Sequence, residues 1–137
     1  MTASAHAPCE DVAVDAKDKF RSELFGVVSQ LVNLFSGAIT ILCIDANART
    51  GSIRSDHIGD KQPDIENDNG GRLRGMLESC RLKACNTYFD AGWTWMSTRS
   101  KKWRIDYVSV DLGLWDEVVC SRVAGELDIS MSAKEDH

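Results

Sequence analysis

The stretch Ala38–Asn47, AITILCIDAN, decides the fold. Its first seven residues form an uncharged apolar run, which predicts a strand buried on both faces of a sheet. The run ends abruptly in Asp45-Ala46-Asn47, and side chains two residues apart point the same way at the end of a strand. Asp45 and Asn47 are candidate functional residues, because α/β sheets usually place their sites at strand ends. Turn formation explains the same residues equally well, since Asp and Asn favour turns.

A long amphipathic helix is predicted before this strand, from about Asp15 to Phe35. Its apolar side consists of Phe20, Leu24, Val27, Val28, Leu31 and Phe35. The uncharged span Leu24–Ile44 is long enough to cross a bilayer. Against a membrane span, the helix has a polar face, and Ser36-Gly37 supplies a helix stop ahead of the strand. We therefore expect no membrane contact.

After the strand, the pattern is a loop, a helix and several short strands. Arg49–Asn69 is rich in Gly, Asp, Asn and Ser, which indicates a long surface loop. A helix is expected over Gly70–Leu82, with Asn69 as its N-cap and a basic side formed by Arg72 and Arg74. The β-like segments that follow are Ala84–Phe89, Trp93–Met96, Arg104–Val110 and Glu117–Val123. Strands without helices between them favour an α/β domain with a mixed sheet.

The composition sets limits on size, charge and compartment. A chain of 137 residues is one domain in size. It has 16 basic and 21 acidic residues, a net charge of −5, so bulk charge does not make it a polyanion binder. Any contact with nucleic acid needs a local basic patch or metal ions. Five cysteines without a CxxC spacing favour a reduced, intracellular protein, nuclear or cytoplasmic.

Two further acidic positions are candidates for chemistry. Asp106 lies inside the apolar segment Arg104–Val110, where an unpaired charge is costly. An edge strand that leaves Asp106 in water, or an ion pair with Arg104, explains it as well, and the local sequence leaves these alternatives open. The terminal pair Asp136-His137 carries little weight alone, because chain ends are usually disordered.

Aromatic and basic residues alternate near the end of the chain. Trp93-Thr94-Trp95 is followed by Arg99, Lys101, Lys102 and Arg104. Such a combination can stack nucleic-acid bases and bind phosphates. A core hairpin with a solvated basic turn is the ordinary alternative.

Several motifs, taken in order, resemble those of the endonuclease/exonuclease/phosphatase superfamily. ILCIDANA (Ile41–Ala48) resembles the GDFNA strand end of that family. The later matches are NDNGGRL (Asn67–Leu73), LKACNTYF (Leu82–Phe89), TWMS (Thr94–Ser97), RIDYVSV (Arg104–Val110) and the final DH. They are most similar to the endonucleases of non-LTR retrotransposons and to craniofacial-development-protein-like sequences.

The resemblance implies a metal-dependent phosphodiesterase that cleaves DNA with Mg²⁺ or Mn²⁺. In that family's mechanism Asp45 would orient or deprotonate the attacking water, and Asn47 would contact the phosphate. Asp106 would orient His137, which would stabilise the charged transition state, and Asp136 would assist the metal site. The contacts to phosphate or nucleic acid would come from His6, Trp95, Arg99, Lys101, Lys102 and Arg104.

The chain also departs from the family pattern. His6 stands where the family has a tyrosine, and the family's asparagine and metal-binding glutamate lie upstream of anything matched here. Residues 1–137 therefore resemble the C-terminal part of the domain: a partial four-layer α/β sandwich, a mixed sheet flanked by helices, without the family's N-terminal strands. Glu10 and Asp11 are the nearest acidic residues to the start, but nothing places them as substitutes for the glutamate.

The expected function is a metal-dependent phosphodiester hydrolase of the DNA endonuclease type, with weak or no activity. The alternative is a catalytically inactive remnant of the same fold that binds nucleic acid or protein. Losing strands exposes the sheet, so self-association through that sheet is also expected.

Overall fold

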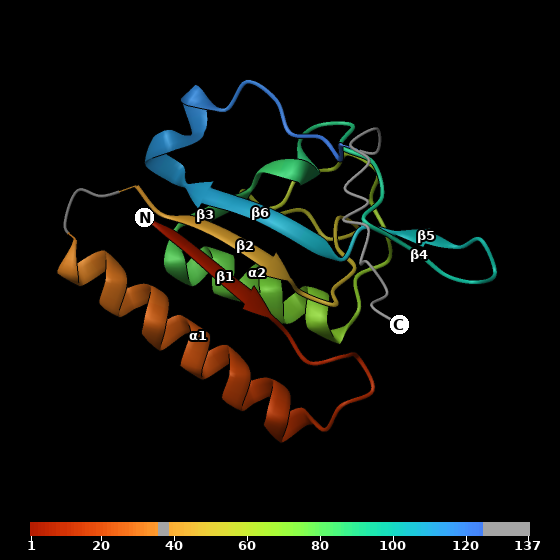
Figure 1. Cartoon of the computed structure of the whole chain (residues 1–137), viewed down its shortest axis with the longest axis horizontal. Helices are drawn as coiled ribbons and strands as arrows, with labels where there is room; N and C mark the ends of the chain where they lie inside the picture. Colours follow the sequence, from red (N-terminus) through yellow and green to blue (C-terminus); the bar gives the residue numbers. More distant parts are fainter. Residues whose placement is uncertain (36–38, 125–137) are drawn as a thin grey trace, which may run out of the picture.

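A computed structural model describes residues 1–35 and 39–124 of the chain (Figure 1). The described residues form two α-helices, α1 and α2, six strands, and two 3₁₀ helices, η1 and η2. The elements in chain order are β1 (Thr2–His6), α1 (Val14–Leu34), β2 (Ile41–Asp45), α2 (Asp68–Cys80), β3 (Leu82–Ala84), η1 (Cys85–Thr87), β4 (Trp95–Met96), β5 (Lys102–Trp103), β6 (Asp106–Asp111) and η2 (Leu112–Glu117).

The main sheet has four strands in the order β1-β2-β6-β3, and β4 and β5 form a separate hairpin. β1 and β2 are parallel and are connected through α1, whereas β6 runs antiparallel to both of its neighbours, β2 and β3. The predicted α/β fold with a mixed sheet is therefore confirmed. The four-stranded sheet and the helices α1 and α2 form two packed layers.

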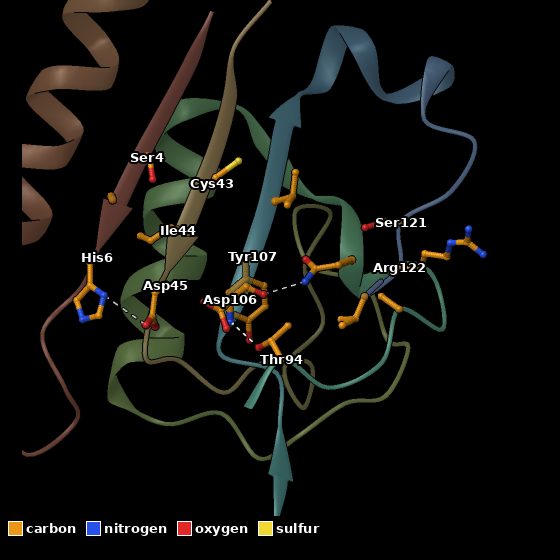
Figure 2. Close-up of a pocket in the computed structure, with 15 residues that line it drawn as sticks. Ser4, His6, Cys43, Ile44, Asp45, Thr94, Asp106, Tyr107, Ser121 and Arg122 are labelled. Carbon is orange, nitrogen blue, oxygen red and sulfur yellow. Dashed lines mark hydrogen bonds and ion pairs between the residues drawn. The ribbon is translucent and has the colours of Figure 1, made fainter. Parts of the chain in front are cut away.

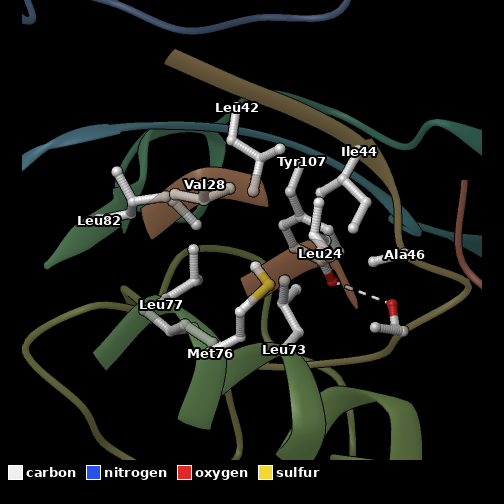
Figure 3. Packing of buried hydrophobic residues seen from close by; sticks show 13 residues of the cluster. Leu24, Val28, Leu42, Ile44, Ala46, Leu73, Met76, Leu77, Leu82 and Tyr107 are labelled. Carbon is white, nitrogen blue, oxygen red and sulfur yellow. Dashed lines mark hydrogen bonds between the residues drawn. The ribbon is translucent and has the colours of Figure 1, made fainter. Parts of the chain in front are cut away.

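The hydrophobic core lies between the sheet and both helices (Figure 3). Leu42 and Ile44 of β2 and Tyr107 of β6 point into it from the sheet. The helices contribute Leu24 and Val28 from α1, and Leu73, Met76 and Leu77 from α2. The predicted apolar side of α1 is narrower than expected, because Val27 and Phe35 are exposed.

The buried hydroxyl group of Tyr107 connects the core to the loop that follows β2 and to the residue before Ile105. The Tyr107 hydroxyl lies 3.0 Å from the carbonyl oxygens of Ala48 and Arg104 and 3.1 Å from the Thr50 hydroxyl. Burial raises the pKa of Tyr107. The phenol therefore remains a neutral hydrogen-bonding group that fixes the start of the long loop.

Two of the predicted strands are not observed: a 3₁₀ helix follows the start of the first, and the second is almost entirely irregular. Ala84–Phe89 was expected to be extended, but only its first residue belongs to β3, and η1 follows. The Thr87 hydroxyl donates to the Ala84 carbonyl at 2.6 Å, which favours a tight turn over a strand. Glu117–Val123 is not a strand either: η2 ends at its first residue, after Asp111 has capped η2 through the Gly113 amide.

The start of α2 also differs from the prediction. Asn67, not Asn69, is the N-cap, and its side chain accepts a hydrogen bond from the Gly70 amide. Asn69 is instead buried, and its side-chain amide donates to the carbonyls of Pro8 and Asn47. The cap therefore lies two residues earlier than the sequence pattern indicated.

The expected basic side of α2 is neutralised by neighbouring acids. Arg72 pairs with Asp68 in its own helix and with Asp18 of α1, and the buried Lys17 of α1 also contacts Asp68. Arg74 pairs with Glu66 and Glu78. The Arg72–Asp18 and Lys17–Asp68 pairs join the two helices. Because both arginines are paired, α2 offers little free positive charge to a nucleic acid.

In the described ranges, 1–35 and 39–124, the model contains no helix with the length and apolar character that a bilayer crossing requires.

The ion pairs between the helices predict a pH-dependent contribution to stability. Arg72 and Lys17 hold the pKa of Asp68 below its ordinary value of 3.8. The contribution is therefore present above that value and is lost as the pH falls through the lower, folded-state pKa. We expect Asp68→Asn to lower the melting temperature at neutral pH, and this deficit to narrow below about pH 3.8.

Thermal melts over a pH series test this prediction. The control is Asp116→Asn, a change at an exposed residue of η2. A deficit for Asp68→Asn that stays constant from neutral to acidic pH would contradict the assignment.

Candidate active site

A hollow of about 670 Å³ lies on the sheet face opposite the helices. Figure 2 shows its floor, formed by the ends of β1, β2 and β6, with Thr94 and the stretch around Arg122 on the far side. Its polar and charged lining residues are Ser4, His6, Asp45, Asn86, Thr94, Asp106, Ser121 and Arg122.

Two predicted site residues, Asp45 and Asp106, meet at this hollow. They are direct partners in the antiparallel pairing of β2 with β6, so their side chains leave the same face of the sheet. The adjacent Ala46 amide donates to the Ile105 carbonyl at 2.9 Å. The Asp45–Asp106 position is therefore a non-hydrogen-bonded pair, the type in which opposing side chains come closest. Two carboxylates of like charge face each other at one rim.

His6 extends this row onto a third strand. It is the direct partner of Asp45 in the parallel pairing of β1 with β2. Its Nδ1 lies 3.4 Å from Asp45 Oδ2, and its side chain is 72% exposed against 28% for Asp45 (Figure 2). A histidine therefore stands beside an acid at the position where the family that the sequence resembles has a tyrosine.

Asp45 also forms the turn that the sequence suggested as an alternative. Its Oδ1 accepts a hydrogen bond from the Asn47 amide at 3.1 Å. One carboxylate oxygen therefore stabilises the turn, and the other faces His6. Asp45 therefore stabilises a turn and also lies at the candidate site, so the two interpretations of this residue are compatible.

Asn47 lies beside the hollow and does not line it. Its backbone is left-handed, with φ of 46°, and its side-chain amide donates to the Ala7 carbonyl at 2.9 Å. The residue lines a neighbouring hollow of about 480 Å³ together with Arg49, Trp95 and Trp103. Asp45 and Asp106 therefore come together, whereas Asn47 is turned towards a separate space.

Asn86 and Thr94 hold Asp106 in place, although the sequence did not single them out for a role. The Thr94 hydroxyl accepts hydrogen bonds from the amides of Ile105 and Asp106, at 2.9 and 3.1 Å. The Asn86 side chain donates to the Asp106 carbonyl at 2.8 Å and is otherwise buried. Both residues lie in the quoted LKACNTYF and TWMS motifs, so only the motifs themselves could have pointed to them.

The β4–β5 hairpin projects from the body next to the second hollow (Figure 1). Trp95 and Trp103 stack with their ring centroids 5.0 Å apart and their planes 6° from parallel. The Arg49 guanidinium lies 5.7 Å from the centroid of Trp103. The exposed basic residues of the hairpin are Arg99, Lys101 and Lys102. The structure thus combines an aromatic stack with a basic turn.

Arg104 does not belong to this basic surface. Its side chain is buried, with 6% exposure, and donates to the carbonyls of Asn86, Lys61 and Gln62 at 2.5–3.1 Å. Burial lowers its pKa. The prediction that Arg104 contacts nucleic acid is therefore wrong, because protein carbonyls enclose its guanidinium.

The carboxylate of Glu10 is used by the fold. It accepts hydrogen bonds from the Asp68 and Asn69 amides, at 3.1 and 3.2 Å, and from the Asn67 side chain at 2.8 Å. An acidic group at a helix N-terminus satisfies free amides and the helix dipole. Glu10 is therefore occupied at the start of α2 and does not face the hollow.

The described residues do not assemble a site for Mg²⁺ or Mn²⁺. Across residues 1–35 and 39–124, no group of three His, Cys, Asp or Glu side chains is arranged to hold a metal ion. The predicted residues Asp136 and His137 lie outside the described residues. Asp45 and Asp106 alone supply fewer oxygen ligands than the metal site implied by the resemblance would need.

Comparison with protein-family models finds no match, and comparison with curated proteins finds none either. The resemblance to the superfamily therefore rests on the motifs quoted above.

The opposed carboxylates predict a gain in stability when one charge is removed. The Asp106 carboxylate accepts no hydrogen bond within the described part of the chain. Like charges directly across a strand pair are destabilising, so we expect Asp106→Asn to raise the free energy of unfolding by roughly 0.2–1 kcal/mol at low ionic strength. The gain should shrink at about 1 M salt, where charges are screened within about 3 Å.

Urea unfolding at both salt concentrations measures this effect. The matched control is Asp111→Asn, which should give no gain because that carboxylate caps η2. A loss of stability in Asp106→Asn at low salt would show that the charge of Asp106 is compensated.

Proposed function

We propose that this chain is a DNA phosphodiester hydrolase-type domain of the endonuclease/exonuclease/phosphatase superfamily, with weak or no hydrolytic activity. The observation that carries the proposal is the opposition of Asp45 and Asp106 at a rim next to an aromatic and basic hairpin. Acids at strand ends supply proton acceptors, while stacked aromatics and basic residues suit a nucleic acid.

In the proposed reaction a water molecule attacks the phosphorus of a DNA phosphodiester, and the bond from phosphorus to one sugar oxygen breaks. The departing sugar oxygen takes a proton from solvent. Asp45 would orient this water and accept its proton, and Asp106 would keep the opposite side of the rim negative. Asn86 and Thr94 would keep Asp106 in position through its main chain.

Weak activity is proposed because the groups available for catalysis are incomplete. Glu10 is held by α2, and the Asn47 amide is held by Ala7. Each would need to leave a hydrogen-bonded position before it could serve the reaction. These two observations favour the second candidate function, a catalytically inactive nucleic-acid- or protein-binding remnant.

The proposed partner is DNA, and self-association remains a prediction. β1 is an edge strand of the sheet, and edge strands without charged side chains favour pairing with another chain. Of its residues, only His6 can carry charge.

Nicking of supercoiled plasmid DNA tests the catalytic part of the proposal. Metal stabilisation of a phosphate contributes several kcal/mol, and about 1.4 kcal/mol corresponds to a factor of ten in rate. Because the described residues do not assemble a metal site, we expect the unaltered chain, with magnesium, to nick the plasmid no faster than the Asp45→Ala variant does. Rapid magnesium-dependent nicking that disappears in Asp45→Ala would instead establish an active enzyme.

Binding of labelled duplex DNA in the presence of EDTA tests the hairpin. Stacking of a base on an aromatic ring contributes roughly 1–3 kcal/mol, so Trp95→Ala should weaken binding by about a factor of five or more. Trp93→Ala is the matched control, because Trp93 is similarly exposed but lies outside the stacked pair. Equal binding by both variants would remove the hairpin from the interface.

A further inference from the structure

The hollow over the sheet is rich in negative charge. Asp45 and Asp106 face each other on its floor (Figure 2), and the Cβ atoms of such directly opposed residues lie about 4.5–5.5 Å apart. Arg122 lines the far side, and no ion pair joins it to either carboxylate within the described residues. The basic residues of the hairpin do not line the hollow. Its charge therefore favours a cationic ligand over an anionic one.

The two carboxylates differ in how many of their lone pairs the fold uses. Both oxygens of Asp45 have partners, because Oδ1 accepts the Asn47 amide at 3.1 Å and Oδ2 faces His6 Nδ1 at 3.4 Å. The Asp106 carboxylate accepts no hydrogen bond from the described part of the chain. A ligand that donates N–H groups therefore gains most from Asp106.

Asn86 supplies a third acceptor and points to a ligand independently of the acid pair. Its side chain lines the hollow and is 6% exposed, and its Oδ1 has no hydrogen-bond partner among the described residues. The position of this oxygen is fixed, because the other end of the amide donates to the Asp106 carbonyl at 2.8 Å, and a carbonyl can only accept. A buried acceptor without a donor is costly, so a ligand that donates to Asn86 relieves that cost.

An apolar strip lies beside the two acids on the same floor. Cys43 of β2 pairs directly with Val108 of β6, two residues along each strand from Asp45 and Asp106 and on the same face. Both side chains line the hollow, and Val108 is 41% exposed. A bare metal ion would use the acids alone. A lysine-like group would use both parts, because it combines an apolar stem with a charged tip.

We propose that this hollow binds a primary alkylammonium group. The nitrogen lies between Asp45, Asp106 and the Asn86 oxygen, and the alkyl chain follows the apolar strip. An ammonium group has three N–H donors and no acceptor, which matches three acceptors. Its source is a lysine side chain of a partner protein or a free polyamine. The inference goes beyond the proposed function, because it depends neither on hydrolysis nor on binding of DNA.

Titration of the isotope-labelled full chain with n-butylammonium, at neutral pH and constant ionic strength, tests the inference through the backbone amide resonances. We expect saturable changes that centre on Asp45 and Asp106. Asp106→Asn removes one charge a few ångströms from the ammonium and should weaken binding by roughly fivefold or more. Asp45→Asn should weaken it less, because the oxygens of Asp45 have other partners.

Asp116→Asn is the matched control, because it removes the same charge at an exposed residue of η2 and should bind like the unaltered chain. Two further probes separate charge from hydrogen bonding: n-butanol has the chain without the charge, and tetramethylammonium has the charge without N–H donors. Both should bind much more weakly than n-butylammonium. Thermal melts confirm that each variant is folded.

Two more probes distinguish the sources of the group. Tighter binding of Nα-acetyl-lysine amide than of putrescine assigns a lysine of a partner protein, and the reverse order assigns a free polyamine. Resonance changes that spread over the acidic surface without saturation would overturn the inference, and so would equal affinities of Asp106→Asn and Asp116→Asn. Plasmid nicking and duplex binding test the proposed function separately, so each can fail while the other stands.

Discussion

The antiparallel pairing of β2 with β6 is the constraint on which the rest of the structure depends. It directs Leu42, Ile44 and Tyr107 onto the helices and, by strand alternation, turns Asp45 and Asp106 to the other face. A shift of either strand by one residue would exchange the two faces of that strand, which would expose its core side chains and bury its carboxylate. Burying one large apolar side chain contributes about 1.5–3 kcal/mol, which exceeds the roughly 0.2–1 kcal/mol cost of opposing two like charges. The core therefore holds the acid pair together.

Much of this fold could be predicted because its signals are local. The helix expected over Asp15–Phe35 is observed as Val14–Leu34, and the apolar run ending at Ile44 contains all of β2 except its last residue, Asp45. The two 3₁₀ helices could not be predicted from hydrophobic pattern, because Thr87 and Asp111 bend the chain through side-chain hydrogen bonds to the backbone. Periodicity describes which face is apolar, and it does not report such bonds.

The candidate site was predictable only in part, for a related reason. The sequence singled out Asp45 and Asp106 one by one, whereas their direct pairing follows from the register of β2 with β6. The roles of Glu10 and Arg104 depend on partners far away in sequence, the amide of Asp68 and the carbonyl of Lys61. A charged residue looks the same in a sequence whether it binds a ligand or completes the fold. Only the three-dimensional arrangement separates the two.

The buried Arg104 limits how far the long loop after β2 can move. Its guanidinium binds Lys61 and Gln62 of that loop and Asn86 of η1, and the Lys61 amide donates in turn to the Thr87 carbonyl. Lifting this part of the loop would strip a cation of its carbonyl ligands in the protein interior, which is costly. The middle of the loop is therefore a member of the same cooperative unit as the sheet, and it opens when the domain unfolds. A segment without regular secondary structure is in this way excluded from serving as a flap over the acid pair.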